Sequence, residues 1–252
     1  MSSAKQGAYV GRVEADLSSS RLERFAASAS EPKWEYLARY AWNVALCEAF
    51  YPSLHHIEVV LRNRLYDLGE AAYQYHHVEH IDCWLDANPS HLHQHGISDV
   101  EKAKKKLFGV DRKTGAVRLP SRSYAAGDLV AALDFGFWTG LFSNYYLFQS
   151  SRDTRLWPHG LGRVFPHSTA KLGLVTISRR FNEVRHLRNR IFHHEPIWRR
   201  NLNDDYHNIM ELLDWMSPEI ARVLRSTERL SEVLSDDFRR RLRIQVYRES
   251  RR

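Results

Sequence analysis

Residues 185–198 read RHLRNRIFHHEPIW and form the most informative stretch of the chain. Arginines, an asparagine and two adjacent histidines follow one another in a helical pattern, and Pro196 then disfavours helical geometry at Glu195. A helix is therefore expected to end near His193 or His194. Arginine binds phosphate through a planar fork of donors, and histidine transfers protons near neutral pH. The stretch thus carries the side chains needed to cleave RNA without a metal.

The helix that ends here has an apolar stripe and a polar seam. On an ideal helix each residue turns by about 100°. One stripe then contains Ile177, Phe181, Val184, Arg188 and Ile191, and the neighbouring seam contains Arg185, Asn189 and His193. Arg188 and His193 lie about 140° apart, so one straight helix cannot direct both at the same phosphate. A second copy of the chain, packed about a two-fold axis, is expected to complete the site.

The rest of the composition indicates one ordered, all-α chain. Hydrophobic residues make up 43% of the 252 residues and aromatic residues 12%, which excludes a disordered protein. Helical periodicity recurs and no useful β-alternation does. The two cysteines, Cys47 and Cys83, form no disulfide framework, so a reducing cytoplasm is the expected location. The most apolar segment, 129–148, carries Asp134, so no membrane span is expected.

Periodicity and breaking residues predict a series of helices. The expected ranges are 34–50, 53–69 with an apolar stripe from Leu54 to Leu68 and with Gly69 as its C-cap, a helical continuation to about 85, 97–108, 128–148, a motif helix capped by Ser168 or Thr169, 203–224 and 236–248. Residues 109–127 have no periodicity and are expected to form a flexible insertion. The whole chain, 1–252, is expected to be a single domain. It has an N-terminal helical half at about 30–125, a half at about 126–235 that carries the motif, and a basic C-terminal helix or tail at 236–252.

Positive charge is concentrated in two places. The formal net charge is +7, but residues 238–252 hold seven arginines and one glutamate, and residues 179–200 hold seven arginines and two glutamates. These segments carry +6 and +5, which leaves −4 for the remainder. Such a distribution is typical of a protein that binds a polyanion, with a solvated helix face and basic tail as the alternative. The expected RNA-binding residues are Arg190, Arg199, Arg200 and Trp198.

A sequence similar to the motif occurs earlier in the chain. Residues 58–66 read EVVLRNRLY and residues 183–192 read EVRHLRNRIF. Where the second copy has His193, the first has Asp67, so the first copy lacks the titrating group. A supporting role is therefore expected for Glu58, Arg62 and Asn63. Glu58 and Arg62 stand at i and i+4 in the favourable order for an ion pair.

With these residues, the chain resembles the HEPN class of nucleotide-binding domains, and within it the Abi-like (abortive infection) branch. The class signature is an arginine, often followed by asparagine, then four to six residues and a histidine. Arg188, Asn189 and His193 match its tightest form, and His194 fits the wider spacing. Further similarity lies in AFYPSL at 49–54, in Glu58 with the LRN run at 61–63, at 135–141, and in LRNRIFHHEPI at 187–197. The resemblance covers about 34–224.

This resemblance implies a HEPN-like helical bundle of four or five main helices that dimerises, here with additional N-terminal helices. Active members are metal-independent endoribonucleases that act in phage defence or as toxins. His193 would be the general base or acid, Arg188 would hold the phosphate and Asn189 would orient one of them, with His194 as an alternative and Arg185 in support. The expected partners are RNA, a second copy of the chain and a possible cognate antitoxin or regulator. No cofactor and no membrane are expected.

Two other functions remain open. The first is a non-catalytic HEPN-type module that binds RNA or another protein, in which Arg188 and Asn189 only cap and pair helix ends. The second is a helical metal-binding protein that uses a cluster of histidines around one cysteine: His76, His77, His80, Cys83, His91, His93 and His95. The endoribonuclease hypothesis itself assigns no metal ligands.

Overall fold

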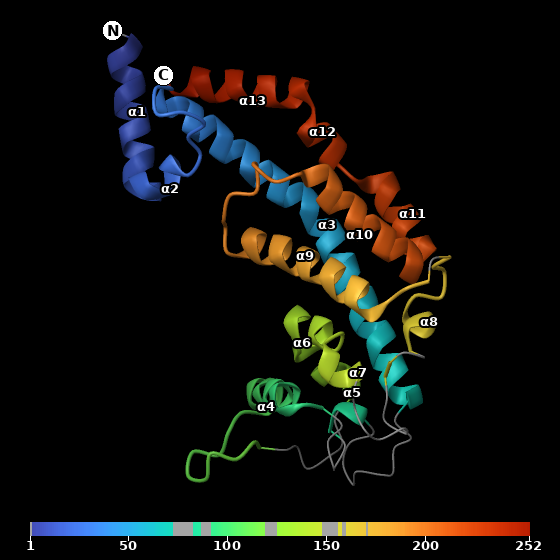
Figure 1. Ribbon diagram of the computed structural model, residues 1–252. Helices are drawn as coiled ribbons and strands as arrows, with labels where there is room; N and C mark the ends of the chain where they lie inside the picture. The colour runs from blue at the N-terminus through green and yellow to red at the C-terminus, as the bar shows by residue number, and fades with distance from the viewer. Residues whose placement is uncertain are drawn as a thin grey trace. The chain divides into compact units, whose positions relative to one another are not determined.

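The structure is a computed structural model, and it describes residues 2–72, 83–86, 92–118, 125–147, 156–157, 160–169 and 171–252. The α-helices are α1 (Ser2–Leu17), α2 (Ser19–Glu23), α3 (Lys33–Ala72), α4 (Gln94–Phe108), α5 (Ala126–Ala132), α6 (Phe135–Gly140), α7 (Asn144–Leu147), α8 (Leu161–Val164), α9 (Leu174–Phe192), α10 (Leu202–Met216), α11 (Pro218–Thr227), α12 (Leu230–Leu234) and α13 (Asp236–Glu249), with a 3₁₀ helix at Trp84–Asp86 (Figure 1). These residues form no strands and one isolated β-bridge, Val110–Val117. The predicted all-α class is confirmed.

None of the helices in the described part of the chain combines the length and the apolar character needed to cross a membrane.

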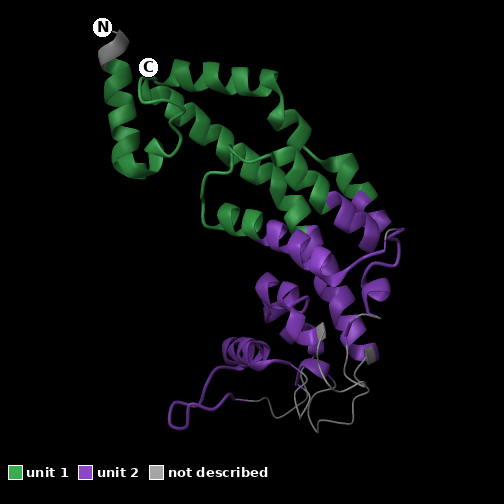
Figure 2. Cartoon of the chain, in the orientation of Figure 1, with its two compact units in different colours: residues 1–55, 186–209, 222–252 green, residues 56–185, 210–221 purple. Residues whose placement is uncertain are grey.

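The chain divides into two compact units, each assembled from separate segments (Figure 2). Unit 1 comprises residues 1–55, 186–209 and 222–252, and unit 2 comprises residues 56–185 and 210–221. Helices α3 and α9 therefore each contribute residues to both units. The end of α9 and the segment that follows it, which carry the histidine motif, belong to unit 1.

Helix α3 corrects the expectation of two helices separated at Pro52. It is a single helix of 40 residues with Pro52 inside it. A proline inside a helix costs about 3 kcal/mol or more. Apolar side chains on both sides of it are buried, including Leu46, Phe50 and Ile57, each 0% exposed, and each burial contributes about 1.5–3 kcal/mol. This packing outweighs the proline, and the predicted apolar stripe continues from Leu54 to Leu68.

Gly69 does not end the helix, contrary to the prediction that it is a C-cap. Helix α3 continues to Ala72, and Gly69 is buried within it. A Cβ at this position would lie 2.1 Å from Cε2 of the Trp84 indole. The glycine is therefore required by close packing against Trp84, not by chain reversal.

Other predicted helix boundaries were also wrong. The helix expected at 128–148 is divided into α5, α6 and α7, because Asp134 leaves helical geometry and its Oδ1 accepts a hydrogen bond from the Phe137 amide at 2.8 Å. The helix expected at 203–224 is divided at Ser217, where Pro218 begins α11. Helix α9 begins at Leu174, so neither Ser168 nor Thr169 caps it. The helix predicted at 236–248 is confirmed as α13.

The predictions for residues 73–85 and 109–127 fall only partly on described residues. Residues 73–82 and 119–124 lie outside them. In the described part of 109–127, the Val110–Val117 bridge closes a turn in which Asp111 Oδ1 accepts hydrogen bonds from the amides of Lys113 and Thr114.

In unit 1, α13 runs beside the N-terminal half of α3 (Figure 1). Arg243 of α13 forms an ion pair with Glu35 of α3. Trp42 of α3 donates from Nε1 to the carbonyl of Val233 in α12 at 2.9 Å. These contacts hold the basic C-terminal helix against α3.

In unit 2, aromatic side chains form the centre of the core. The ring of Phe142 stacks on Trp157 and on Phe181 of α9, with centroid distances of 5.2 Å in both pairs. Trp157 donates from Nε1 to the carbonyl of Leu141 at 2.7 Å. This cluster anchors the N-terminal part of α9.

Candidate functional site

The motif helix α9 ends in a Schellman motif. His194 adopts a left-handed conformation with φ of 58°, its amide donates to the carbonyl of Ile191 at 3.0 Å, and the amide of Glu195 donates to the carbonyl of Arg190 at 2.7 Å. The helix therefore ends at Phe192, one or two residues before the predicted end at His193 or His194. The proline at 196 is placed as expected, just beyond the turn.

His193 and His194 line a small pocket of about 200 Å³ in unit 1. The other described residues of its lining are Ser18, Ser20, Arg21, Arg24, Phe25 and Pro196. Two arginines and two histidines thus meet, and the described lining contains no carboxylate. The side chain of His193 is exposed. Such a lining has the charge and the donors needed to hold a phosphate group.

The side chain of Arg188 lies in different surroundings from that of His193. Its guanidinium carbon lies 4.6 Å from the centre of the Phe192 ring, and that ring lies 6.3 Å from Tyr51 of α3. Arg188 is not part of the described lining of the His193 pocket. Asn189, on the polar seam, is exposed, and Arg188 is half-buried at the edge of the buried stripe, in which Leu187 is 0% exposed. The structure therefore brings His193 together with Arg21 and Arg24 and leaves Arg188 outside their pocket.

The supporting residues belong to the other unit. Glu58, Arg62, Asn63 and Arg185 all lie in unit 2. The two copies of the LRNR run have the same exposure pattern: buried leucine, half-buried arginine, exposed asparagine and half-buried arginine. The last arginine also has the same type of contact in both copies. Arg64 and Arg190 each donate to a backbone carbonyl at 2.7 Å, of Met216 and Pro196 respectively.

A buried asparagine fixes the segment that follows the motif. Asn43 of α3 is 4% exposed, and its Oδ1 accepts hydrogen bonds from the amides of Ile197 at 2.7 Å and Trp198 at 3.2 Å. Ile197 itself is fully buried. Asn43 thereby sets the position of Trp198 relative to α3.

The arginines predicted to bind RNA make contacts within the chain. Arg190 donates to Pro196 and forms an ion pair with Glu195 at 3.4 Å. Arg200 forms a two-pronged pair with Asp205 at 2.8 and 2.6 Å. Arg199 donates to the carbonyl of Ala26 at 2.6 Å. All three therefore have a structural role in holding the segment after α9.

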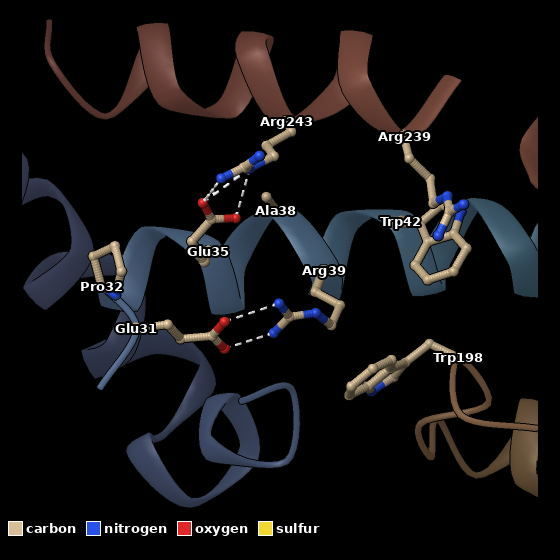
Figure 3. A pocket seen from close by; sticks show the side chains of 9 residues that line it. All are labelled: Glu31, Pro32, Glu35, Ala38, Arg39, Trp42, Trp198, Arg239 and Arg243. Carbon is tan, nitrogen blue, oxygen red and sulfur yellow. Dashed lines mark hydrogen bonds and ion pairs between the residues drawn. The ribbon is translucent and has the colours of Figure 1, made fainter. Parts of the chain in front are cut away.

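A larger cavity of about 690 Å³ lies beside Trp198 in unit 1 (Figure 3). Its described lining consists of Glu31, Pro32, Glu35, Ala38, Arg39, Trp42, Trp198, Arg239 and Arg243. Hydrogen bonds from Arg39 hold the pKa of Glu31 below its usual range, and the hydrogen bond to Glu35 raises the pKa of Arg243. Both carboxylates are thus paired with arginines.

The histidine cluster considered for a metal lies largely outside the described residues, which include only His93, His95 and Cys83 of its members. The described residues contain no group of three or more potential metal ligands. His93 Nδ1 accepts a hydrogen bond from the amide of Gly96 at 2.9 Å and so caps the N-terminus of α4. This histidine has a structural role at the start of a helix.

Sequence reasoning missed the pocket residues Arg21, Arg24 and Trp42, and also Asn43, which positions Trp198. Arg21 and Arg24 stand at i and i+3 on a short basic helix face, which is the only local signal they carry. Asn43 is a single polar residue within a long apolar pattern.

No family model, no curated protein and no solved structure matches the chain.

Proposed function

We propose that the protein is a metal-independent endoribonuclease of the HEPN type, as its resemblance to the Abi-like branch implies. The observation that carries the proposal is the pocket in which His193 meets Arg21 and Arg24 without a described carboxylate. A proton-transfer group and phosphate-binding groups are the two components that RNA cleavage by an internal nucleophile requires. The sequence motif at the end of α9 contains the same two kinds of side chain, in Arg188 and His193.

In the proposed reaction, His193 removes the proton of a ribose 2′-hydroxyl. The 2′-oxygen forms a bond to the adjacent phosphorus while the bond from phosphorus to the 5′-oxygen breaks, and the leaving oxygen takes a proton from an acid. The products are a 2′,3′-cyclic phosphate and a 5′-hydroxyl. Arg21 and Arg24 stabilise the charge that develops on the phosphate oxygens. Asn189 orients the phosphate or the histidine.

A second copy of the chain provides Arg188 in this proposal. Within one chain, Arg188 packs on Phe192 and lies outside the His193 pocket. Two α9 helices around a two-fold axis would place Arg188 of the partner subunit near His193. The homodimer is thus part of the proposed mechanism, because the site is incomplete without it.

The test is cleavage of total RNA by purified protein in excess EDTA, followed by sequencing of the cleaved ends. Wild-type protein is expected to leave 2′,3′-cyclic phosphate ends, and His193→Ala is expected to lower the rate by about 10²–10⁴-fold while helicity is retained. Equal cleavage by both proteins would refute the proposal. RNA binding without cleavage by wild-type protein would instead favour the non-catalytic HEPN-type module. Cleavage that requires an added divalent metal would favour the metal-binding alternative.

The proposed biological role is phage defence by abortive infection, or action as a toxin. Cells that express wild-type protein are then expected to stop growing, and cells that express His193→Ala are expected to grow normally. The same assay detects a cognate antitoxin as a gene product that restores growth.

A further inference from the structure

The cavity beside Trp198 has the composition of a nucleotide-binding site. Two indoles, of Trp42 and Trp198, line it together with three arginines (Figure 3). Its volume, about 690 Å³, lies within the range of about 300–1,000 Å³ that is usual for small-molecule sites. Indole rings stack on planar bases, and guanidinium groups bind phosphate.

The charges in this cavity favour an anionic ligand over a cationic one. Arg39 binds both carboxylate oxygens of Glu31, at 2.7 and 3.0 Å, and Arg243 binds the carboxylate of Glu35. These two ion pairs neutralise both described carboxylates of the lining. Arg239 remains as the excess positive charge, and its only described ion pair is with Asp236, whose side chain is 94% exposed. Such an exposed pair is weak, so Arg239 can turn toward a phosphate.

The two indoles differ in how they are held. Trp42 donates its Nε1 hydrogen to Val233, and the guanidinium of Arg239 lies 5.1 Å from its ring centre. Trp198 is stacked against Arg39 at 5.0 Å and Arg199 at 4.6 Å. Its Nε1 is buried and has no acceptor among the described residues.

From these observations we infer that the cavity binds one unpaired nucleotide, with the base against the indoles and the phosphate on Arg239. The expected source of the nucleotide is an RNA strand. This choice of source rests on the proposed endoribonuclease function, whereas the nucleotide site itself does not. The segment at Phe25 connects the two pockets, because Phe25 lines the His193 pocket and its carbonyl accepts a hydrogen bond from Arg39 of the larger cavity. A strand held at Trp198 would thus run close to His193, and unpaired RNA would be selected over duplex.

The experiment measures binding in the full-length His193→Ala protein, so that cleavage does not interfere. The probes are a fluorescent RNA dodecamer without self-complementarity, the same dodecamer annealed to its complement, and AMP as an unlabelled competitor, with anisotropy as the readout. Helix α13 provides a matched control. Arg239 and Arg240 are neighbours that pair with Asp236 and Asp237 at i−3, but only Arg239 lines the cavity. Both glutamine variants lose one positive charge.

Arg239→Gln is expected to weaken binding of the unpaired dodecamer at least fivefold more than Arg240→Gln. Trp198→Ala is expected to weaken it about tenfold, whereas Trp198→Phe retains most of the affinity because the ring can still stack. Displacement by AMP identifies a site that accepts a free nucleotide. Failure of AMP to compete, with the Arg239 effect intact, identifies a site that requires a strand. Both results support a nucleotide site.

Equal effects of Arg239→Gln and Arg240→Gln would overturn the inference, because only net charge would then matter. Binding of the duplex as tight as that of the single strand would overturn it as well. If Trp198→Ala fails to fold, the comparison of Arg239 with Arg240 still decides. Wild-type protein that binds the dodecamer with the Arg239 dependence but never cleaves RNA would leave this site in place and remove the proposed function. RNA cleavage by wild-type protein, with RNA binding that does not depend on Arg239, would support the proposed function and remove this site.

Discussion

Arg21 donates a hydrogen bond from Nη2 to the backbone carbonyl of His194 at 2.8 Å, across 173 positions of the chain. The contact ties the short helix α2 to the left-handed turn that ends α9. Arg21 and Arg24 line the same pocket as His193, so the segment around α2, which has no obvious motif, contributes to the candidate active site.

Replacing His194 by glycine separates its backbone role from any role of its imidazole. At φ of 58°, a glycine avoids the cost of a side chain in the left-handed region, and the carbonyl still accepts from Arg21. His194→Gly is expected to retain RNA cleavage and to keep or raise the free energy of unfolding by up to about 1 kcal/mol, measured by urea denaturation. A folded but inactive His194→Gly protein would show that the imidazole of His194 takes part in the reaction.

Mixing two inactive variants tests the shared site. Arg188→Ala and His193→Ala proteins, each inactive alone, are expected to regain part of the cleavage when mixed, because a heterodimer contains one complete pair across the interface. The measurement is the cleavage rate at constant total protein, with each variant alone as the control. A fully active wild-type monomer, identified by sedimentation at the assay concentration, would contradict the dimer model.

Removal of the Asn43 amide should destabilise the segment after the motif. Asn43→Ala leaves the amides of Ile197 and Trp198 without their shared acceptor, and the expected loss is about 1–3 kcal/mol in the free energy of unfolding. Val44→Ala is the control, since Val44 is the next residue of α3 and is 50% exposed. Comparable stability losses in the two urea titrations would show that Asn43 does not hold the segment.

Two helical glycines should respond in opposite directions to alanine. Gly69→Ala would place a Cβ against Trp84 and is expected to lower the free energy of unfolding by about 1–3 kcal/mol. Gly11→Ala in α1 meets nothing within 4 Å and is expected to raise it by about 0.4–1 kcal/mol. Urea denaturation with circular dichroism compares them. Stabilisation by Gly69→Ala would mean that Trp84 does not pack on α3 as described.

The Glu31–Arg39 ion pair predicts a loss of stability in acid. Hydrogen bonds from Arg39 lower the pKa of Glu31 in the folded protein below its ordinary value of 4.5. A lowered folded-state pKa means that this contribution is present above about pH 4.5 and is lost as the pH falls through the folded value. The stability difference between wild type and Glu31→Gln is therefore expected to shrink from neutral pH to about pH 3. A difference independent of pH would contradict this assignment.

The helical class and the amphipathic patterns follow from the sequence, because side-chain periodicity is a local property. The stripe from Leu54 to Leu68 is buried as predicted, and α13 occupies nearly the predicted range. The end of α9 was predicted to within one or two residues because Pro196 restricts the residue before it. Boundaries elsewhere were wrong where packing overrode a local signal, as at Pro52 and Gly69.

By itself, the sequence determined an all-α chain, a helix that ends beside two histidines, and an angular separation that keeps Arg188 away from His193 in one straight helix. Only the tertiary structure decided which groups surround His193 and Trp198. Arg21, Arg24 and Asn43 are separated from these residues by more than 150 positions, as the contacts to His194 and Trp198 show. Contacts of this kind depend on which helices pack together, and the periodicity of one helix marks its buried face without identifying its partner.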